Sequence, residues 1–151
     1  RSSSQPGTLR FTSFEAYPMT PNDMIRAPRA FPELSSIADE LAPFWSNGTH
    51  EIALPDLHFT LVEGDARDTV PNMTTLADAW FLDGFSPAKN PELWGPDLLS
   101  RVAEKTAPNG TAATYTAAGH VRRALDAAGL ITTRIPGFGR KRHMTIARKI
   151  P

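Results

Sequence analysis

The sequence predicts an α/β layer fold with a largely parallel sheet. Over most of the 151 residues, β-prone segments alternate with segments of helical periodicity, the order that a sheet covered by helices produces. Residues 79–82 form an unbroken apolar run, which is typical of a strand covered on both faces. The last two β-prone segments are joined by a connection too short for a crossover helix, so we expect that pair to be antiparallel.

Length and composition fit one domain of ordinary size, residues 1–151, with residues 1–7 resembling a linker. Hydrophobic residues make up 40% of the chain and charged residues 21%, which argues against wholesale disorder. The formal net charge is zero, so a nucleic acid would have to bind a local basic patch. The absence of cysteine excludes disulfides, thiolate metal sites and a cysteine nucleophile.

No segment predicts an association with a membrane. No apolar run approaches the roughly 20 residues that a spanning helix needs. Residues 1–7 are polar and lack the apolar middle of a signal peptide. We therefore expect a cytoplasmic protein. The chain does not begin with Met, so we also expect its true start to lie upstream.

The first third of the chain predicts one strand and two helical segments. Residues 9–17 are aromatic and β-prone, and predict a strand that ends near Glu15. Thr20 followed by Pro21 is a helix-start signal, so a helix should continue over residues 22–29. A second helix is expected from Phe31 to about Trp45. Its apolar face comprises Leu34, Ile37, Ala38 and Leu41.

The middle of the chain predicts a hairpin, a short helix and the apolar strand. A turn signal at residues 47–48 precedes two β-prone segments, residues 50–54 and 57–62, which flank Pro55 and predict paired strands. Residues 67–73 predict a short helix or turn. The remaining predicted elements are the strand 78–82, the helix 96–106 with Leu98, Leu99 and Val102 inward, a turn at 108–110, the strand 111–116, the helix 117–128 closed by Gly129, and the strands 130–135 and 144–147.

Three acids stand at three predicted strand ends: Glu15, Asp65 and Asp83. The carboxyl ends of parallel strands share one edge, where open α/β sheets bind ligands, so the three carboxylates could line one site. An acid at the end of the second strand of such a fold commonly bonds ribose hydroxyls, and Asp65 could accept from an adenine amino group. Taken singly, each acid also fits the role of a cap or turn residue.

A second cluster is basic and includes an aromatic residue. It comprises Phe138, Arg140, Lys141, Arg142 and His143, with Arg122 and Arg123 on a preceding helix. Such a cluster suits a phosphate backbone with a base stacked on the ring. An ordinary solvated loop explains the same pattern equally well. Lys89 and Asn90 add polar groups to the loop that follows Asp83.

Other catalytic classes lack their motifs. The four histidines are scattered, without an i,i+4 pair or a glutamate at metalloprotease spacing, so we expect no metal site. The chain contains no Gly-x-Ser-x-Gly elbow, which argues against a serine hydrolase. It also contains no Gly-x-x-x-x-Gly-Lys-Ser/Thr phosphate loop.

Several long motifs resemble one known family. Residues 78–94, with the run DGFSPAKNPELW, resemble the signature of the methyltransferase domain of enzymes that make 5-methylaminomethyl-2-thiouridine in tRNA. Residues 110–119, 121–123 and 137–144 resemble further blocks of that domain, and residues 14–18 with Thr20 resemble its second-strand motif. The resemblance spans nearly the whole chain. It implies a Rossmann-like class I methyltransferase fold.

The resemblance also implies an activity and roles for single residues. The expected reaction is S-adenosylmethionine-dependent methylation of the aminomethyl group on the wobble uridine of tRNA. Glu15 would hold the ribose of the cofactor, Asp65 would lie near its adenine, and Asp83 would lie beside the methyl donor and the incoming amine. Contacts with tRNA would come from Phe85, Lys89, Arg122, Phe138, Arg140, Lys141 and Arg142.

The sequence departs from the family pattern at its beginning. Such folds begin with a strand that ends in a Gly-x-Gly loop and lies at the centre of the sheet, and no such loop precedes Leu9. We therefore expect the chain to be the C-terminal portion of a longer protein, with the first strand missing. The family includes fusions to a flavin oxidase domain, which nothing here resembles. Two alternatives stay open: a non-catalytic tRNA-binding module, and a methyltransferase for another amine.

Overall fold

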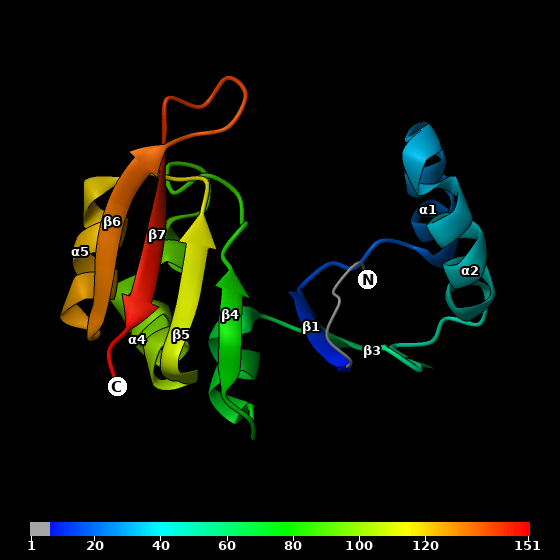
Figure 1. Cartoon of the computed structure of the whole chain (residues 1–151), viewed down its shortest axis with the longest axis horizontal. Helices are drawn as coiled ribbons and strands as arrows, with labels where there is room; N and C mark the ends of the chain where they lie inside the picture. Colours follow the sequence, from blue (N-terminus) through cyan, green and yellow to red (C-terminus); the bar gives the residue numbers. More distant parts are fainter. Residues whose placement is uncertain (1–6) are drawn as a thin grey trace. The chain divides into compact units, whose positions relative to one another are not determined.

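The computed structural model describes residues 7–151, so most of the linker expected at residues 1–7 lies outside the described residues. The chain divides into two compact units, and the boundary along the sequence lies between Asp65 and Ala66. Each unit has its own sheet, so the strands form two sheets where the sequence predicted one (Figure 1). The alternation of strands and helices confirms the α/β class.

The first unit contains a three-stranded sheet in the order β1-β3-β2. The strands are β1 (Leu9–Glu15), β2 (Glu51–Leu54) and β3 (Leu57–Glu63). β1 runs parallel to β3, with Glu15 opposite Glu63. β2 and β3 pair antiparallel, which confirms the predicted hairpin.

Two helices of the first unit lie side by side: α1 (Pro21–Arg26) and α2 (Ser35–Ser46) (Figure 1). Two 3-10 turns join them, η1 (Ala27–Ala30) and η2 (Pro32–Leu34). Thr20 caps α1 as predicted, because its hydroxyl accepts a 3.2 Å hydrogen bond from the Asp23 N–H. α2 packs on the sheet through Trp45, whose ring meets Phe59 edge to face at 5.5 Å.

The expected apolar face of α2 is only partly buried. Of its four predicted residues only Ala38 is fully buried, whereas Leu34 is 40% exposed and Ile37 45% exposed. Leu34 lies in the 3-10 turn η2, so α2 begins later than the predicted start at Phe31. The described residues of the first unit cover only part of the predicted face.

The second unit contains a four-stranded mixed sheet in the order β4-β5-β7-β6. Its strands are β4 (Ala77–Phe81), β5 (Thr106–Thr114), β6 (Leu130–Pro136) and β7 (His143–Lys149). β4 and β5 are parallel, and β7 runs antiparallel to β5 and to β6, which confirms the closing hairpin. The carboxyl ends of β4, β5 and β6 therefore lie at one edge of this sheet.

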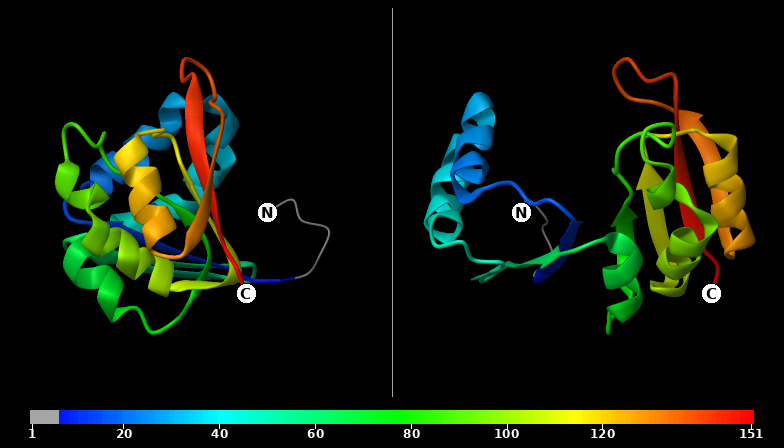
Figure 2. Two further views of the ribbon diagram at one scale, coloured as in Figure 1. Left: turned by 90° about the vertical axis from the view of Figure 1, so that its left-hand side faces the viewer. Right: turned by 180° about the vertical axis from the view of Figure 1, so that it is seen from behind.

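Most helices of the second unit begin and end close to the predicted positions, but no helical turn was predicted at Pro91–Trp94. The helical elements are α3 (Ala66–Thr69), η3 (Val70–Asn72), η4 (Pro91–Trp94), α4 (Pro96–Glu104) and α5 (Gly119–Ala127). α4 and α5 lie on the same face of the sheet (Figure 2). Leu99 and Leu125 from these helices are each 1% exposed, so the core of the unit lies between helices and sheet.

Strand β4 corrects one expectation. The apolar run was expected to be covered on both faces, but Trp80 is its only fully buried residue, and Phe81 is 72% exposed. The physical reason is that, among the described residues, only one face of this sheet is packed: Trp80 is in register with the buried Ala112 and Ala147, whereas Phe81 is in register with Ala113 and with Ile146, which is 40% exposed. The apolar run thus contains one fully buried side chain and does not mark a strand that is covered on both faces.

The predicted turn at residues 108–110 is instead an irregularity inside β5. The strand register shifts there, since Ala77 pairs with Thr106 but Ala79 pairs with Thr111. Asn109 has a φ of 64°, which asparagine tolerates better than most residues. Gly110 lies so close to Thr106 and Ala77 that a Cβ would meet the Thr106 methyl at 2.7 Å. A turn signal thus became a bulge because the chain continues in the same sheet.

Among residues 7–151 no helix is long and apolar enough to cross a membrane.

Candidate active site

Asp83 stands where β4 ends, beside the end of β5. The last hydrogen bond between these strands joins the Leu82 N–H to the Ala113 carbonyl at 2.9 Å. The next residue, Asp83, is exposed. The ladder thus presents this carboxylate to solvent at the edge where parallel strands end, as the sequence predicted.

The turn after Asp83 is fixed by two side chains that sequence reasoning did not select. The Tyr115 hydroxyl donates a 2.6 Å hydrogen bond to the Gly84 carbonyl. The Trp94 indole N–H donates a 2.6 Å hydrogen bond to the Phe85 carbonyl. Tyr115 lay inside the predicted strand 111–116, whereas β5 ends at Thr114, so its place directly after a strand end was not visible in the sequence. Trp94 offered no signal either.

The residue after the acid must be small. A Cβ on Gly84 would lie 3.0 Å from Leu93 Cδ1 and 3.9 Å from the Trp94 ring. Larger side chains would push this turn away from the segment that covers it. Glycine at this place in the DGF run therefore has a packing reason.

The basic hairpin lies at the same edge of the sheet as Asp83. We use this name for residues 137–142, which connect β6 to β7. Thr145, near the start of β7, donates from its buried hydroxyl to the Thr116 carbonyl at 2.8 Å, just beyond the end of β5. Within the hairpin, the Lys141 ammonium lies 5.0 Å from the centre of the Tyr115 ring.

The other predicted tRNA contacts in the second unit are mostly accessible. Phe138 is 92% exposed and Phe85 76% exposed, so either ring can stack on a base. Lys89, Arg140 and Arg142 are exposed as well.

Arg122 differs from these residues, because it is half-buried in the first half of α5. Its Nε is buried and has no hydrogen-bond partner among the described residues.

Glu15 and Asp65 share one end of the sheet of the first unit. The Gly64 N–H donates to the Glu15 carbonyl at 3.0 Å, which brings the chain before Asp65 beside the end of β1. The exposed Glu15 carboxylate accepts a 2.9 Å hydrogen bond from Ser13 Oγ, and Asp65 is half-buried. The structure thus brings two of the three predicted acids together. That all three line one site stays a prediction, since Asp83 belongs to the other unit.

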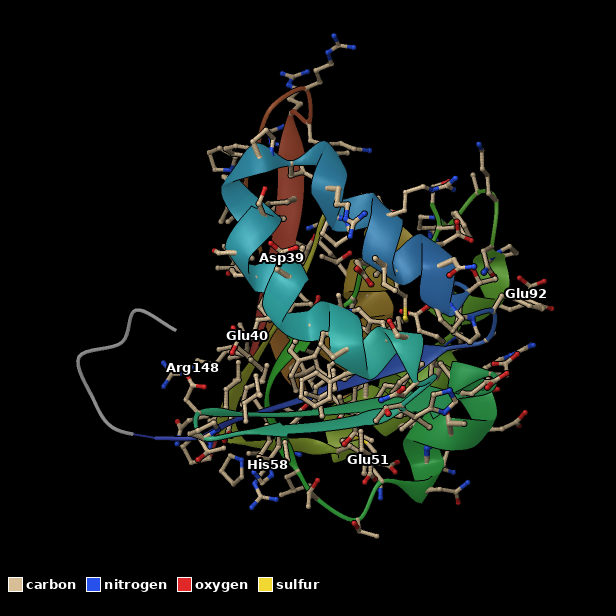
Figure 3. The ribbon with its side chains drawn as sticks, turned by 90° about the vertical axis from the view of Figure 1, so that its right-hand side faces the viewer. Asp39, Glu40, Glu51, His58, Glu92 and Arg148 are labelled. Atoms are coloured by element: carbon tan, nitrogen blue, oxygen red, sulfur yellow. The ribbon has the colours of Figure 1, made fainter. Side chains whose placement is uncertain are left out.

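No metal centre is formed by residues 7–151: no three His, Cys, Asp or Glu side chains gather closely enough to hold an ion. In Figure 3, Asp39 and Glu40 lie on α2 while Glu51 and His58 belong to the β2–β3 hairpin. These possible metal-binding side chains thus lie on different elements and do not gather at one point.

An α/β fold with acids at the carboxyl ends of parallel strands defines the class of Rossmann-like enzymes whose ligands bind at that edge. A model of the family described as S-adenosyl-L-methionine-dependent methyltransferase matches residues 32–150. The chain belongs to this family.

Two relatives with curated names are more than 40% identical to this chain. The tRNA 5-methylaminomethyl-2-thiouridine biosynthesis bifunctional protein MnmC of Pseudomonas savastanoi pv. phaseolicola is 44% identical over 138 residues, 88% of this chain and 21% of that protein. Its namesake from Caulobacter sp. is 45% identical over 139 residues, covering 89% of this chain and 23% of that protein. The chain thus spans about a fifth of the length of the curated relatives it matches.

Solved structures agree with the class. The crystal structure of MNMC2 from Aquifex aeolicus superposes with a TM-score of 0.72 at 31% identity, covering 95% of this chain and 45% of that one. CalS10, an amino pentose methyltransferase from Micromonospora echinaspora, is 12% identical with a TM-score of 0.50, covering 94% of this chain and 84% of that one. The second likeness concerns the fold alone.

Proposed function

We propose that this chain methylates the aminomethyl group on the wobble uridine of tRNA, converting 5-aminomethyl-2-thiouridine to 5-methylaminomethyl-2-thiouridine in the cytoplasm. The observation that carries the proposal is the pairing of an exposed carboxylate, Asp83, with a basic hairpin at one edge of one sheet. The carboxylate can accept a hydrogen bond from an amine, and the cations of the hairpin can bind the phosphates of a tRNA backbone. The names of the relatives support the same substrate.

The cofactor is assigned to side chains whose chemistry suits it. S-adenosylmethionine supplies an activated methyl group when it is bound. Glu15 is an exposed carboxylate at a strand end and can accept from ribose hydroxyls, while Asp65 can accept from the adenine amino group. Both are acceptors, and the adenosine part of the cofactor offers the matching donors. These residues fit the group they are proposed to hold.

Asp83 is the proposed catalytic residue. With S-adenosylmethionine bound, the substrate nitrogen would gain the methyl group and lose one proton, so the site would need a group that can take that proton. The amine must be neutral and aligned with the methyl carbon to react. The Asp83 carboxylate can accept a hydrogen bond from the amine, hold that alignment and take or relay the proton. An exposed acid at the end of β4 can do this without disturbing the core.

Recognition of tRNA is assigned to the exposed cations and rings of the second unit. Arg140 and Arg142 can each bind a phosphate, with Arg122 and Lys89 as further cations of the same unit. Phe85 or Phe138 can stack on the uridine once it has left the base stack.

The test is methyl transfer to tRNA that carries 5-aminomethyl-2-thiouridine, with the product nucleoside identified by its mass. We expect wild-type protein to form the methylaminomethyl nucleoside and Asp83→Asn to lose at least about 100-fold in kcat. Asp78→Asn is the matched control, because it removes the same charge from an exposed residue at the opposite end of β4.

The competing functions give different results in the same assay. A tRNA-binding module would bind tRNA in a salt-sensitive way but transfer no methyl group. A methyltransferase for another amine would bind S-adenosylmethionine but leave this nucleoside unchanged. An Asp83→Asn protein as active as the Asp78→Asn protein would reject the assigned role of Asp83.

A further inference from the structure

Asp83 is held by a backbone turn whose residues form no strand pairing. The strand pairing ends at Leu82, and the carbonyl of the residue that follows Asp83, Gly84, is bound by the hydroxyl of Tyr115 at 2.6 Å. A hydrogen bond of this length is short for an O–H donor and a carbonyl. It reaches across from the end of the neighbouring strand, β5, and fixes the peptide unit between Gly84 and Phe85, one residue beyond the acid.

The Tyr115 ring is itself held by neighbours in the second unit. It meets Trp94 edge to face, with centroids 6.3 Å apart and planes at 82°. Trp94 is 3% exposed and binds the Phe85 carbonyl, so it is an anchored partner. The Lys141 ammonium lies 5.0 Å from the centre of the Tyr115 ring. The ring therefore contacts both the segment that covers the turn and the basic hairpin.

The conformation of the hairpin keeps Lys141 near this ring. The Gly137 N–H donates to the Arg142 carbonyl at 3.2 Å, which closes the loop. A Cβ on Gly137 would overlap the Lys141 carbonyl oxygen, and Gly139 has a φ of 60°. The backbone at Lys141 is thus held by local packing rather than left to sample many directions.

From these contacts we infer that Tyr115 is a positioning residue for methyl transfer: its hydroxyl sets the turn that carries Asp83, and its ring connects that turn to the basic hairpin. The inference rests on the function proposed above. Tyr115 acts through the Gly84 carbonyl and does not touch the reacting atoms. Lys141 is accordingly assigned to the Tyr115 ring, which leaves Arg140 and Arg142 as the phosphate-binding cations of the hairpin.

The first test is the kinetics of Tyr115→Phe, which keeps the ring and removes only the hydroxyl. We expect kcat to fall about tenfold, because small displacements of a catalytic group cost rate steeply. The KM for tRNA should stay within about twofold, since the hydroxyl binds the protein's own carbonyl.

A matched control separates positioning from general stability. Thr106→Val removes a buried hydroxyl that donates a 2.7 Å hydrogen bond to the Val102 carbonyl, at the other end of β5. This variant loses a hydrogen bond of similar length to a backbone carbonyl, but far from the turn along the same strand. We expect it to lower thermal stability and leave kcat unchanged.

The second test needs no activity: hydrogen exchange of the amides in residues 84–90. Tyr115→Phe should speed exchange there several-fold, whereas Thr106→Val should not. If the wild type transfers methyl groups and Tyr115→Phe matches it in kcat and in exchange, the inference is overturned. If the wild type transfers none while the exchange result holds, the proposed function fails and the role of Tyr115 in setting the turn is supported.

Discussion

The two units of the chain bury very different amounts of apolar side chain. Among the described residues, the fully buried hydrophobic side chains of the first unit are Ala38, Ile52 and Leu61. The second unit buries several more, among them Leu99, Val121 and Leu125 at 1% exposure or less. Burial of apolar surface is the main free-energy gain that offsets chain entropy. We therefore expect the second unit to be the more stable and the first to depend on additional contacts.

The exposed apolar residues of the first unit point the same way. Tyr17 is 94% exposed, Leu9 59% and Phe31 53%. In the second unit, the most exposed apolar side chains, Phe138 and Phe85, are the ones we assign to base stacking. The second unit also has exposed apolar residues away from the edge where Asp83 lies, since Leu76 before β4 is 52% exposed and Ile150 after β7 is 58% exposed.

The largest expected effect on stability comes from the core of the second unit. Leu99→Ala should lower the free energy of unfolding by about 2–5 kcal/mol, because it leaves a cavity at a side chain only 1% exposed. Ile37→Ala, at a residue of α2 that is 45% exposed, should change it by about 0.5 kcal/mol or less. Denaturant unfolding followed by circular dichroism measures both. Equal losses would show that exposed fraction does not distinguish the two units.

A smaller effect is expected from a matched pair of tryptophans. Trp94→Phe should cost about 2 kcal/mol, because Trp94 is 3% exposed and its indole binds the Phe85 carbonyl, which would be left without that donor. Trp45→Phe should cost less than about 1 kcal/mol, since a phenyl ring can still meet Phe59. Unfolding midpoints compare the two variants. A larger loss at Trp45 would contradict the ranking of the units.

The element order was largely predictable from the sequence because its signals are local. The cap at Thr20 and the glycine after α5, Gly129 with a φ of 93°, act within a few residues, and both were read correctly. Burial was harder to predict, because it depends on which strands become neighbours. The exposure of Phe81 depends on which face of the sheet is packed, and the apolar run by itself does not show that.

The residues of the candidate site were likewise predictable only where their signal is local in sequence. Asp83 was found because a strand followed directly by an acid is a local pattern, and the basic hairpin was found from its composition. Tyr115 was not selected, because its role depends on a hydrogen bond to Gly84 across 31 positions of sequence. The placement of Glu15 and Asp65 at one sheet end followed from the parallel register of β1 and β3. Their relation to Asp83 stays a prediction.

A local effect is expected at the cap of α1 in the first unit. Thr20→Ala should destabilise that helix by about 1 kcal/mol, because the Asp23 N–H loses its acceptor. Hydrogen exchange of residues 21–26 should rise, while exchange in α4 and α5 stays unchanged if the second unit is stable by itself. A parallel rise in α4 and α5 would mean that the two units unfold as one.

The central claim is that residues at one edge of the second sheet have separate roles. Asp83 takes part in the reaction, and the exposed arginines of the hairpin bind tRNA. Steady-state kinetics of Asp83→Asn and of the double variant Arg140→Gln/Arg142→Gln, measured with the same modified tRNA, test it most directly. The account predicts that the first variant loses kcat with an unchanged KM for tRNA, and that the second raises KM, more so at higher salt, with kcat retained. If both variants changed kcat and KM alike, or if the double variant bound tRNA as tightly as the wild type, the claim would be contradicted.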